Sequence, residues 1–221
     1  MIDWNNIETV LLDMDGTLLD LYFDNFFWQE YLPEKWGEIH ELDRDTAKAR
    51  LVPRFRNMAG TLSWYCVDYW SRELDIDVMA LKADLEHLIQ IRPHSETLLR
   101  HLREVNIPTV MVTNAHEKLI ELKMDKTRID RYFDRIFCAH RLGAPKEAPA
   151  FWKRLSEELT FTPEKTVLID DNLVVLRTAR EFGIRHLLTI AQPDSRSTRR
   201  VIEEFPVIES FEQLLDQQHE T

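Results

Sequence analysis

Two pairs of acidic residues each come directly after a short apolar segment of the sequence. Asp13 and Asp15 follow the first such segment, and Asp170 and Asp171 follow another one late in the chain. Carboxylates crowded into one cleft resist ionisation unless a cation lies among them. Magnesium binds through a few carboxylates and keeps positions open for water and phosphate. The sequence therefore predicts a Mg²⁺ site formed by these four residues.

Polar residues that can hold a phosphoryl group follow two further apolar segments. Thr113 and Asn114 offer a hydroxyl and an amide at the end of one segment, and Lys146 offers a cation in the turn after another. With a metal bound, a carboxylate close to phosphorus can attack it and form an acyl phosphate. A second carboxyl group can protonate the leaving oxygen and then deprotonate water. The pattern predicts phosphoryl chemistry, with these three residues as phosphate ligands.

The apolar segments are short and continuous, which is typical of strands buried on both faces of a sheet. Patterns with helical spacing separate them, so the sequence predicts an α/β fold with a Rossmann-like parallel sheet flanked by helices. Ligands of such sheets bind beyond the carboxyl ends of the strands, where all the candidate residues lie. The predicted strands span residues 9–12, 108–112, 135–138, 166–169 and 184–190.

Residues 21–92 differ from the rest of the chain. They contain helical patterns without a convincing strand, and they hold 12 of the 22 aromatic residues. We interpret them as a helical cap inserted after the first strand, with a hydrolase core formed by residues 1–20 and 93–221. Within the cap, helices are predicted over residues 43–58, 61–74 and 78–89.

The segment Asp13-Met14-Asp15-Gly16-Thr17 resembles the DxDGT motif of the haloacid dehalogenase-like hydrolase superfamily. Thr113, Lys146 and the Asp170-Asp171 pair resemble the later motifs of this superfamily, in the expected order. The resemblance covers nearly the whole chain, including the helical cap. One position departs from it, since many members have proline where this chain has Glu147.

This resemblance implies a role for each acidic residue. Asp13 corresponds to the nucleophile and metal ligand, and Asp15 to the general acid and base whose main-chain carbonyl also meets the metal. Asp171 corresponds to the usual acidic metal ligand, and Asp170 to a second ligand or a neighbour of one. The implied cofactor is Mg²⁺, and the implied reaction is hydrolysis of a phosphomonoester through an aspartyl-phosphate.

A narrower resemblance concerns the cap. Residues 12–28, 64–70 and 113–116 look like the bacterial GMP/IMP 5′-nucleotidase group, which implies a purine nucleoside monophosphate as the substrate. Aromatic side chains could stack on the base, and short polar ones could meet its edge. The alternative is that most of the aromatic residues form the core of the cap itself. The candidates for substrate specificity are Asp24, Asn25, Trp28 and Tyr65.

Charge and composition narrow the possible partners and location. A formal net charge of −11 argues against a nucleic-acid partner, because the phosphate backbone would be repelled. No apolar run is long enough to span a membrane, and the first residues do not resemble a signal peptide. The two cysteines, Cys66 and Cys138, suit a reducing compartment, so we expect a cytoplasmic enzyme. Its oligomeric state is left open.

Other functions remain possible on the same fold. A dehalogenase would use Asp13 on carbon, but it needs neither a metal cluster nor an acid for the halide. A sugar-phosphate phosphatase or a phosphomutase would share all the motifs, so the sequence does not separate them from a nucleotidase. A non-enzymatic interaction protein is disfavoured, because no strand-end carboxylate is missing.

Overall fold

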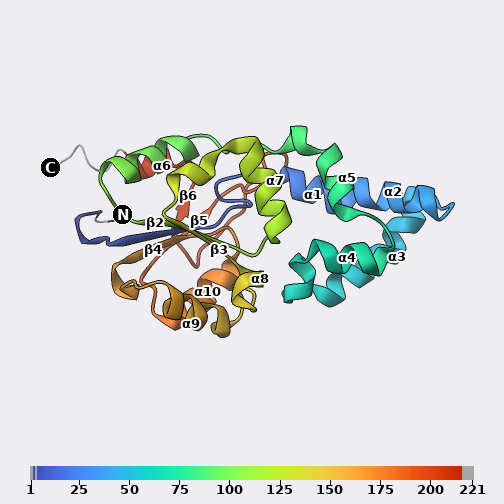
Figure 1. Ribbon diagram of the computed structural model, residues 1–221. Helices are drawn as coiled ribbons and strands as arrows, with labels where there is room; N and C mark the ends of the chain where they lie inside the picture. The colour runs from blue at the N-terminus through green and yellow to red at the C-terminus, as the bar shows by residue number, and fades with distance from the viewer. Residues whose placement is uncertain (1, 3, 216–221) are drawn as a thin grey trace.

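The computed structural model describes residue 2 and residues 4–215, and its centre is a six-stranded parallel sheet (Figure 1). The order of the strands is β3-β2-β1-β4-β5-β6, so the first strand lies in the middle. The prediction of a Rossmann-like α/β fold is confirmed. The strands are β1 (Thr9–Leu12), β2 (Thr109–Thr113), β3 (Arg135–Cys138), β4 (Thr166–Ile169), β5 (His186–Ile190) and β6 (Val207–Ile208).

Alternate residues of each central strand pack on opposite faces of the sheet. In β1, Val10 and Leu12 join one buried apolar cluster, whereas Leu11 joins another. Helices α6 (Ser95–Glu104) and α7 (Glu117–Thr127) cover the first face, and α9 (Pro149–Glu158) and α10 (Leu173–Phe182) cover the second (Figure 1). Burial on both faces explains why the strands are apolar throughout.

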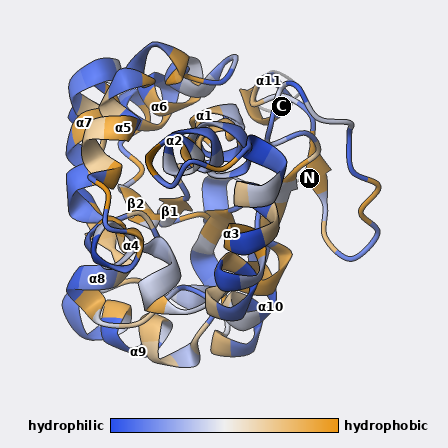
Figure 2. Cartoon of the chain, turned by 90° about the vertical axis from the view of Figure 1, so that its right-hand side faces the viewer, coloured by the Kyte–Doolittle hydropathy of each residue, from blue (hydrophilic) through white to orange (hydrophobic). Residues whose placement is uncertain are grey.

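Residues 21–92, the proposed cap, lie to one side of the sheet and form helices (Figure 1). Its longest helix, α3, is mostly hydrophilic in Figure 2 and buries only Ala47, Leu51 and Phe55. Leu19 and Ile91 form an antiparallel bridge where the chain enters and leaves the cap. The helices of the cap are α1 (Tyr22–Phe26), η2 (Phe27–Tyr31), α2 (Leu32–Ile39), α3 (Arg44–Met58), η3 (Leu62–Tyr65), α4 (Val67–Leu74), α5 (Val78–Asp84) and η4 (Glu86–Leu88).

Some predicted elements differ from the observed ones. The helix predicted over 61–74 is divided, because Thr61 caps a 3₁₀ turn and the Cys66 sulfur then accepts the Tyr69 amide to start α4. One helix was predicted over 78–89, but the observed helix ends at Asp84. A separate 3₁₀ turn, η4, follows it. The two-residue strand β6 was not predicted, since two residues carry no periodicity.

The bridge between Leu19 and Ile91 lies next to the proposed boundaries of the cap, residues 21 and 92, which stay a prediction. Residues 1, 3 and 216–221 of the proposed core lie outside the described part of the chain.

Within the described part of the chain, none of the helices is both long and apolar enough to cross a membrane. The remaining elements are η1 (Trp4–Asn6), η5 (Ile129–Tyr132), α8 (Ala139–Leu142), η6 (Pro163–Lys165) and α11 (Glu212–Leu215).

Candidate active site

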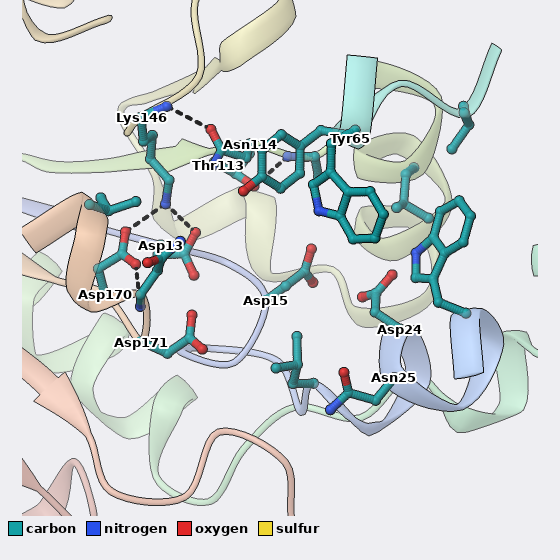
Figure 3. A pocket seen from close by; sticks show the side chains of 18 of the residues that line it. Asp13, Asp15, Asp24, Asn25, Tyr65, Thr113, Asn114, Lys146, Asp170 and Asp171 are labelled. Atoms are coloured by element: carbon teal, nitrogen blue, oxygen red, sulfur yellow. Dashed lines mark hydrogen bonds and ion pairs between the residues drawn. The ribbon is translucent and has the colours of Figure 1, made fainter. Parts of the chain in front are cut away.

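Three carboxylates meet at the carboxyl ends of two neighbouring strands. Strands β1 and β4 pair in register, so that Asp13 and Asp170 follow their last residues side by side, and Asp171 comes next. One oxygen from each of the three side chains lies within 4.8 Å of the others. Figure 3 shows the three side chains directed toward one another. Parallel pairing thus brings together residues that are more than 150 positions apart in the sequence.

Lys146 lies between two of these carboxylates. Its Nζ is 2.5 Å from Asp13 Oδ1 and 2.6 Å from Asp170 Oδ2, and it also donates to the Val112 carbonyl at 3.1 Å. The side chain is 2% exposed. Although burial opposes the charge of Lys146, Asp13 and Asp170 raise its pKa, so the lysine remains a cation. Lys146 therefore pairs with two of the three acids, and Arg200 approaches the third by donating to the Asp171 carbonyl at 2.9 Å. Three acids thus lie near two cations.

Burial and the excess of acids over cations raise the pKa values of the carboxyl groups. Burial raises the pKa of Asp13 to about 6, with Lys146 opposing the shift. Burial, together with the charges of Asp13 and Asp170, raises the pKa of Asp171 well above its usual range. Oxygen donors with excess negative charge are the set that a divalent cation such as Mg²⁺ requires. The cluster of Asp13, Asp170 and Asp171 therefore fits a divalent metal.

Gly16 determines the position of the third acid. Its φ is +83°, and a Cβ at this position would lie 2.7 Å from the Asp171 Cγ. Both the conformation and the close approach require glycine here. The glycine of the DxDGT segment therefore lets the backbone that follows β1 contact the carboxylate that follows β4.

The side chain of Asp15 belongs to a different cluster. It pairs with the Nζ of Lys123 at 2.6 Å, and Lys123 also binds Asp24 at 2.6 Å. The second oxygen of Asp24 accepts from Lys82 at 2.8 Å. Burial raises the pKa of Asp15 to about 6, with Lys123 opposing the shift. Asp15 is thus held at the start of a chain of alternating acids and lysines.

Lys82 and Lys123 were not among the residues selected from the sequence. Their side chains are 0% and 1% exposed, and Lys82 Nζ lies 4.2 Å from the centre of the Phe27 ring. Burial of Asp24 is outweighed by the two lysines, which hold the pKa of this carboxyl well below its usual range. A single lysine in a helical pattern carries no sequence signal of burial, because lysines of this kind are usually solvated.

The phosphate-binding candidates at the end of β2 lie beside the cluster of three acids. Asn114 accepts from the Lys146 amide at 2.8 Å, which holds the lysine turn against the end of β2. The hydroxyl of Thr113 accepts from the Ala115 amide at 3.1 Å. Both side chains are buried and line the same cavity as Lys146.

Glu147 contacts three residues of the cavity wall next to Thr113 and Asn114. It was not selected from the sequence. Its carboxylate accepts from the Tyr65 hydroxyl at 2.5 Å, from Asn114 at 2.9 Å and from Asn172 at 3.0 Å. The only sequence signal was its departure from the proline found in many members of the superfamily. Here the glutamate connects the cap to the ends of β2 and β4.

The four candidates for substrate specificity all reach the cavity, but none is free of protein contacts. Both oxygens of Asp24 are bonded to lysines, and Asn25 donates to Asp194 at 2.7 Å. Trp28 packs against other aromatic rings of the cap, including Trp64 at 5.8 Å between ring centres. The carboxylate oxygens of Asp24 are therefore occupied by contacts with the protein itself. Trp28 packs in the cap and also presents a surface to the cavity.

The cavity has a volume of about 230 Å³ and lies between the sheet and the cap (Figure 3). One end holds the acidic cluster, and the other is lined by aromatic residues. Every residue selected from the sequence lines it: Asp13, Asp15, Asp24, Asn25, Trp28, Tyr65, Thr113, Asn114, Lys146, Asp170 and Asp171.

Known proteins share this architecture and sequence. GMP/IMP nucleotidase YrfG from Escherichia coli (strain K12) is 34% identical over 214 residues, which are 97% of this chain and 96% of the relative. The crystal structure of an HAD phosphatase from Thermococcus onnurineus superposes with a TM-score of 0.79 at 21% identity, covering 96% of this chain and 98% of that one. CbbY from Rhodobacter sphaeroides, solved with phosphate, has a TM-score of 0.65 at 18% identity, covering 94% and 96%.

Residues 7–183 match the model of the haloacid dehalogenase-like hydrolase family. This segment includes β1, the proposed cap, strand β2 with Thr113, and strand β4, which Asp170 follows. It also includes Lys146 and the whole acidic cluster. The chain therefore belongs to the haloacid dehalogenase-like hydrolase family and is a phosphatase, as the sequence predicted.

Proposed function

We propose that this enzyme is a cytoplasmic, Mg²⁺-dependent 5′-nucleotidase that cleaves purine nucleoside monophosphates such as GMP and IMP. The observation that carries the proposal is the cavity itself. The acidic cluster of Asp13, Asp170 and Asp171 lies at one end, and the rings of Trp28 and Trp64 line the part formed by the cap. Tyr65 lies between them, beside Asn114 (Figure 3). A nucleotide has the same polarity, with a phosphate at one end and a flat base at the other.

The proposed reaction begins with attack by Asp13. A carboxylate oxygen of Asp13 bonds to phosphorus while the bond from phosphorus to the ribose oxygen breaks. Asp15 gives its proton to the departing oxygen, and its raised pKa of about 6 supports a proton-holding role. A water molecule then attacks phosphorus, Asp15 takes the water proton, and inorganic phosphate leaves with Asp13 restored.

The surrounding residues hold the phosphoryl group. Lys146, Thr113 and Asn114 would bind its peripheral oxygens, and Lys146 would neutralise part of their charge. Asp13, Asp170 and Asp171 would hold the magnesium ion, together with the main-chain carbonyl of Asp15. The bound ion supplies charge stabilisation to the oxygens on phosphorus.

The choice of a purine rests on the cap and on the relative. The acidic cluster contacts only the phosphoryl group, so discrimination among substrates must come from the surface that faces the leaving group. Trp28, Trp64 and Tyr65 provide that surface. The 34% identical E. coli relative is named a GMP/IMP nucleotidase, which favours a nucleotide over a sugar phosphate.

Steady-state phosphate release tests this proposal. We expect GMP and IMP to have a kcat/KM roughly 5- to 150-fold above that of CMP, UMP or glucose 6-phosphate, the ratio that stacking of ~1–3 kcal/mol supplies. AMP should fall below GMP and IMP, because the edge of its ring differs in hydrogen bonding. Equal rates across the bases, or a preference for the sugar phosphate, would contradict the nucleotidase and leave the phosphatase intact.

A further inference from the structure

A second cluster of potential metal ligands lies outside the catalytic site. Cys66 precedes α4 in the cap, whereas His116 precedes α7 and His140 lies in α8, both in the core. One ligand atom from each residue lies within 4.8 Å of the other two. The two imidazole rings meet edge to face, with 4.7 Å between their centres. The donors are one thiol and two imidazoles, unlike the oxygen donors at Asp13.

His140 is the strongest indication of a missing ligand. Both of its ring nitrogens are buried, and neither makes a well-formed hydrogen bond within the described part of the chain, although the Leu62 backbone lies close to the ring. A buried polar atom without a partner loses its interaction with water and gains nothing in return.

The other two residues make weak contacts that a metal could replace. The Cys66 sulfur accepts from the Tyr69 amide at 3.3 Å, which leaves it able to bind an ion as a thiolate. His116 accepts from the Lys118 amide at 3.4 Å, and its Nε2 lies 3.8 Å from Asp68. Both contacts of His116 are long, so binding exchanges one of them for a bond to metal.

We propose that Cys66, His116 and His140 form a binding site for a borderline-soft divalent ion of the Zn²⁺ type, with an exchangeable fourth ligand. Thiolate and imidazole are the donors that Zn²⁺ prefers, and three protein ligands with one open position are an established arrangement for it. Magnesium prefers oxygen donors and would remain at the acidic cluster. Donor chemistry therefore sorts the two ions between the two sites.

The position of this site connects it to the cavity. Cys66 directly follows Tyr65, and His116 comes two residues after Asn114, both of which line the cavity wall. An ion bound by all three residues joins the cap to the core beside the proposed substrate site. Its occupancy therefore restrains the opening of the cap, independently of which phosphomonoester is cleaved.

Cobalt spectroscopy tests the site without relying on activity. Co²⁺ is added to the whole protein in the presence of excess Mg²⁺, which occupies the oxygen-donor cluster. We expect one tightly held Co²⁺ with a thiolate-to-cobalt charge-transfer absorption band and the visible spectrum of a four-coordinate ion. One equivalent of Zn²⁺ should abolish the band by displacing the Co²⁺. Absence of the band in the wild-type protein would overturn the proposal.

Matched cysteine variants assign the band. Cys66→Ser should remove it, whereas Cys138→Ser should keep it, because Cys138 is a buried thiol that contacts Glu117 and the Arg141 amide instead. His140→Gln should weaken Co²⁺ binding at least ~100-fold. Loss of a residue that only supports a metal ligand already costs up to about that factor, and His140 is a proposed ligand itself. Circular dichroism verifies that each variant is folded. A band that survives in folded Cys66→Ser, or unchanged affinity in folded His140→Gln, would also overturn the proposal.

Discussion

Two buried ionic clusters lie side by side in the cavity and differ in their balance of charge. In the acidic cluster of Asp13, Asp170 and Asp171, which we call the metal cluster after its proposed ion, Lys146 pairs with the first two carboxylates. Arg200 donates to the main-chain carbonyl of Asp171, but the carboxylate of Asp171 has no ion pair among the described residues. In the neighbouring one, which we call the lysine relay, Asp15, Lys123, Asp24 and Lys82 alternate, with two acids and two lysines. Buried charge is costly unless it is paired. The excess charge in the first cluster therefore marks a place that a ligand completes, whereas the relay is complete without one.

The relay also spans the two parts of the molecule. Asp15 follows β1 and Lys123 lies in α7, both in the core, while Asp24 and Lys82 belong to helices of the cap. The orientation of Asp15 thus depends on residues of the cap. The metal cluster is therefore a site for ligands, whereas the lysine relay holds Asp15, the proposed proton donor, in place.

The largest effect is expected from a change within the metal cluster. Asp13→Asn preserves the shape of the side chain but removes the nucleophile, so phosphate release should fall by at least ~10⁴-fold. Far-UV circular dichroism and thermal unfolding should show an intact fold. If this variant retained a tenth of wild-type turnover, Asp13 would not be the nucleophile.

Removal of the metal should affect this cluster and leave the relay unchanged. Exhaustive chelation should abolish phosphate release, and Mg²⁺ should restore it, whereas Ca²⁺ should not, because it accepts more oxygen ligands at longer distances. Magnesium at 100 times its dissociation constant should stabilise the wild type by about 2.7 kcal/mol. In Asp171→Asn this stabilisation should shrink strongly. Full activity after chelation would contradict the proposal that the metal cluster binds a catalytic ion.

A smaller effect on turnover is expected from the relay. Lys123→Met leaves Asp15 buried without its cation, so we expect a loss of about 3–5 kcal/mol in the free energy of unfolding. Turnover at saturating GMP should fall by ~10²-fold, the lower range for general acid–base catalysis. Denaturant titration and steady-state kinetics measure the two quantities.

Lys82→Met is the matched control for that variant. It removes a lysine of equal burial that contacts Asp24 but not Asp15. Its stability should fall by a similar amount, while its turnover should fall much less. Adding Asp24→Asn to Lys82→Met should recover part of the stability, because Lys123 and Asp15 then balance each other. Equal losses of turnover in both lysine variants would mean that Lys123 acts only through stability.

The smallest effect is expected from an ion pair at the surface. Lys165 and Glu8 lie 2.6 Å apart, as close as the pairs of the relay, but both side chains are 51% exposed. Lys165→Met should therefore leave the unfolding midpoint and turnover unchanged within the precision of the measurements. A large loss in this variant would show that proximity, rather than burial, explains the strength of the relay.

Much of the fold could be predicted because its signals are local. Each predicted strand overlaps an observed one, since continuous apolar runs are required for burial on both faces. Errors occurred where side chains acted as caps. Thr61 and Cys66 each start a helical segment, so residues 61–74 form two elements instead of one. The cysteine was not recognised as a cap, because Ser, Thr, Asp and Asn are the usual residues at this position.

Residues that follow the strands could also be selected from the sequence. Asp13, Thr113 and Asp170 each come at the end of an apolar run, and the parallel order of the sheet is enough to bring them to one edge. The sequence alone therefore indicated the family and many of the residues that line the cavity, but not Lys82.

Only the tertiary structure decided how these residues are partnered. Lys123 and Lys82 resemble solvated lysines in the sequence, and Glu147 resembles an ordinary loop residue. Burial is a property of the packed cap and core, and it alone converts a surface charge into a strong ionic contact. The same packing brings Cys66 from the cap to His116 and His140 of the core. Such pairings depend on distances between helices that no local pattern encodes.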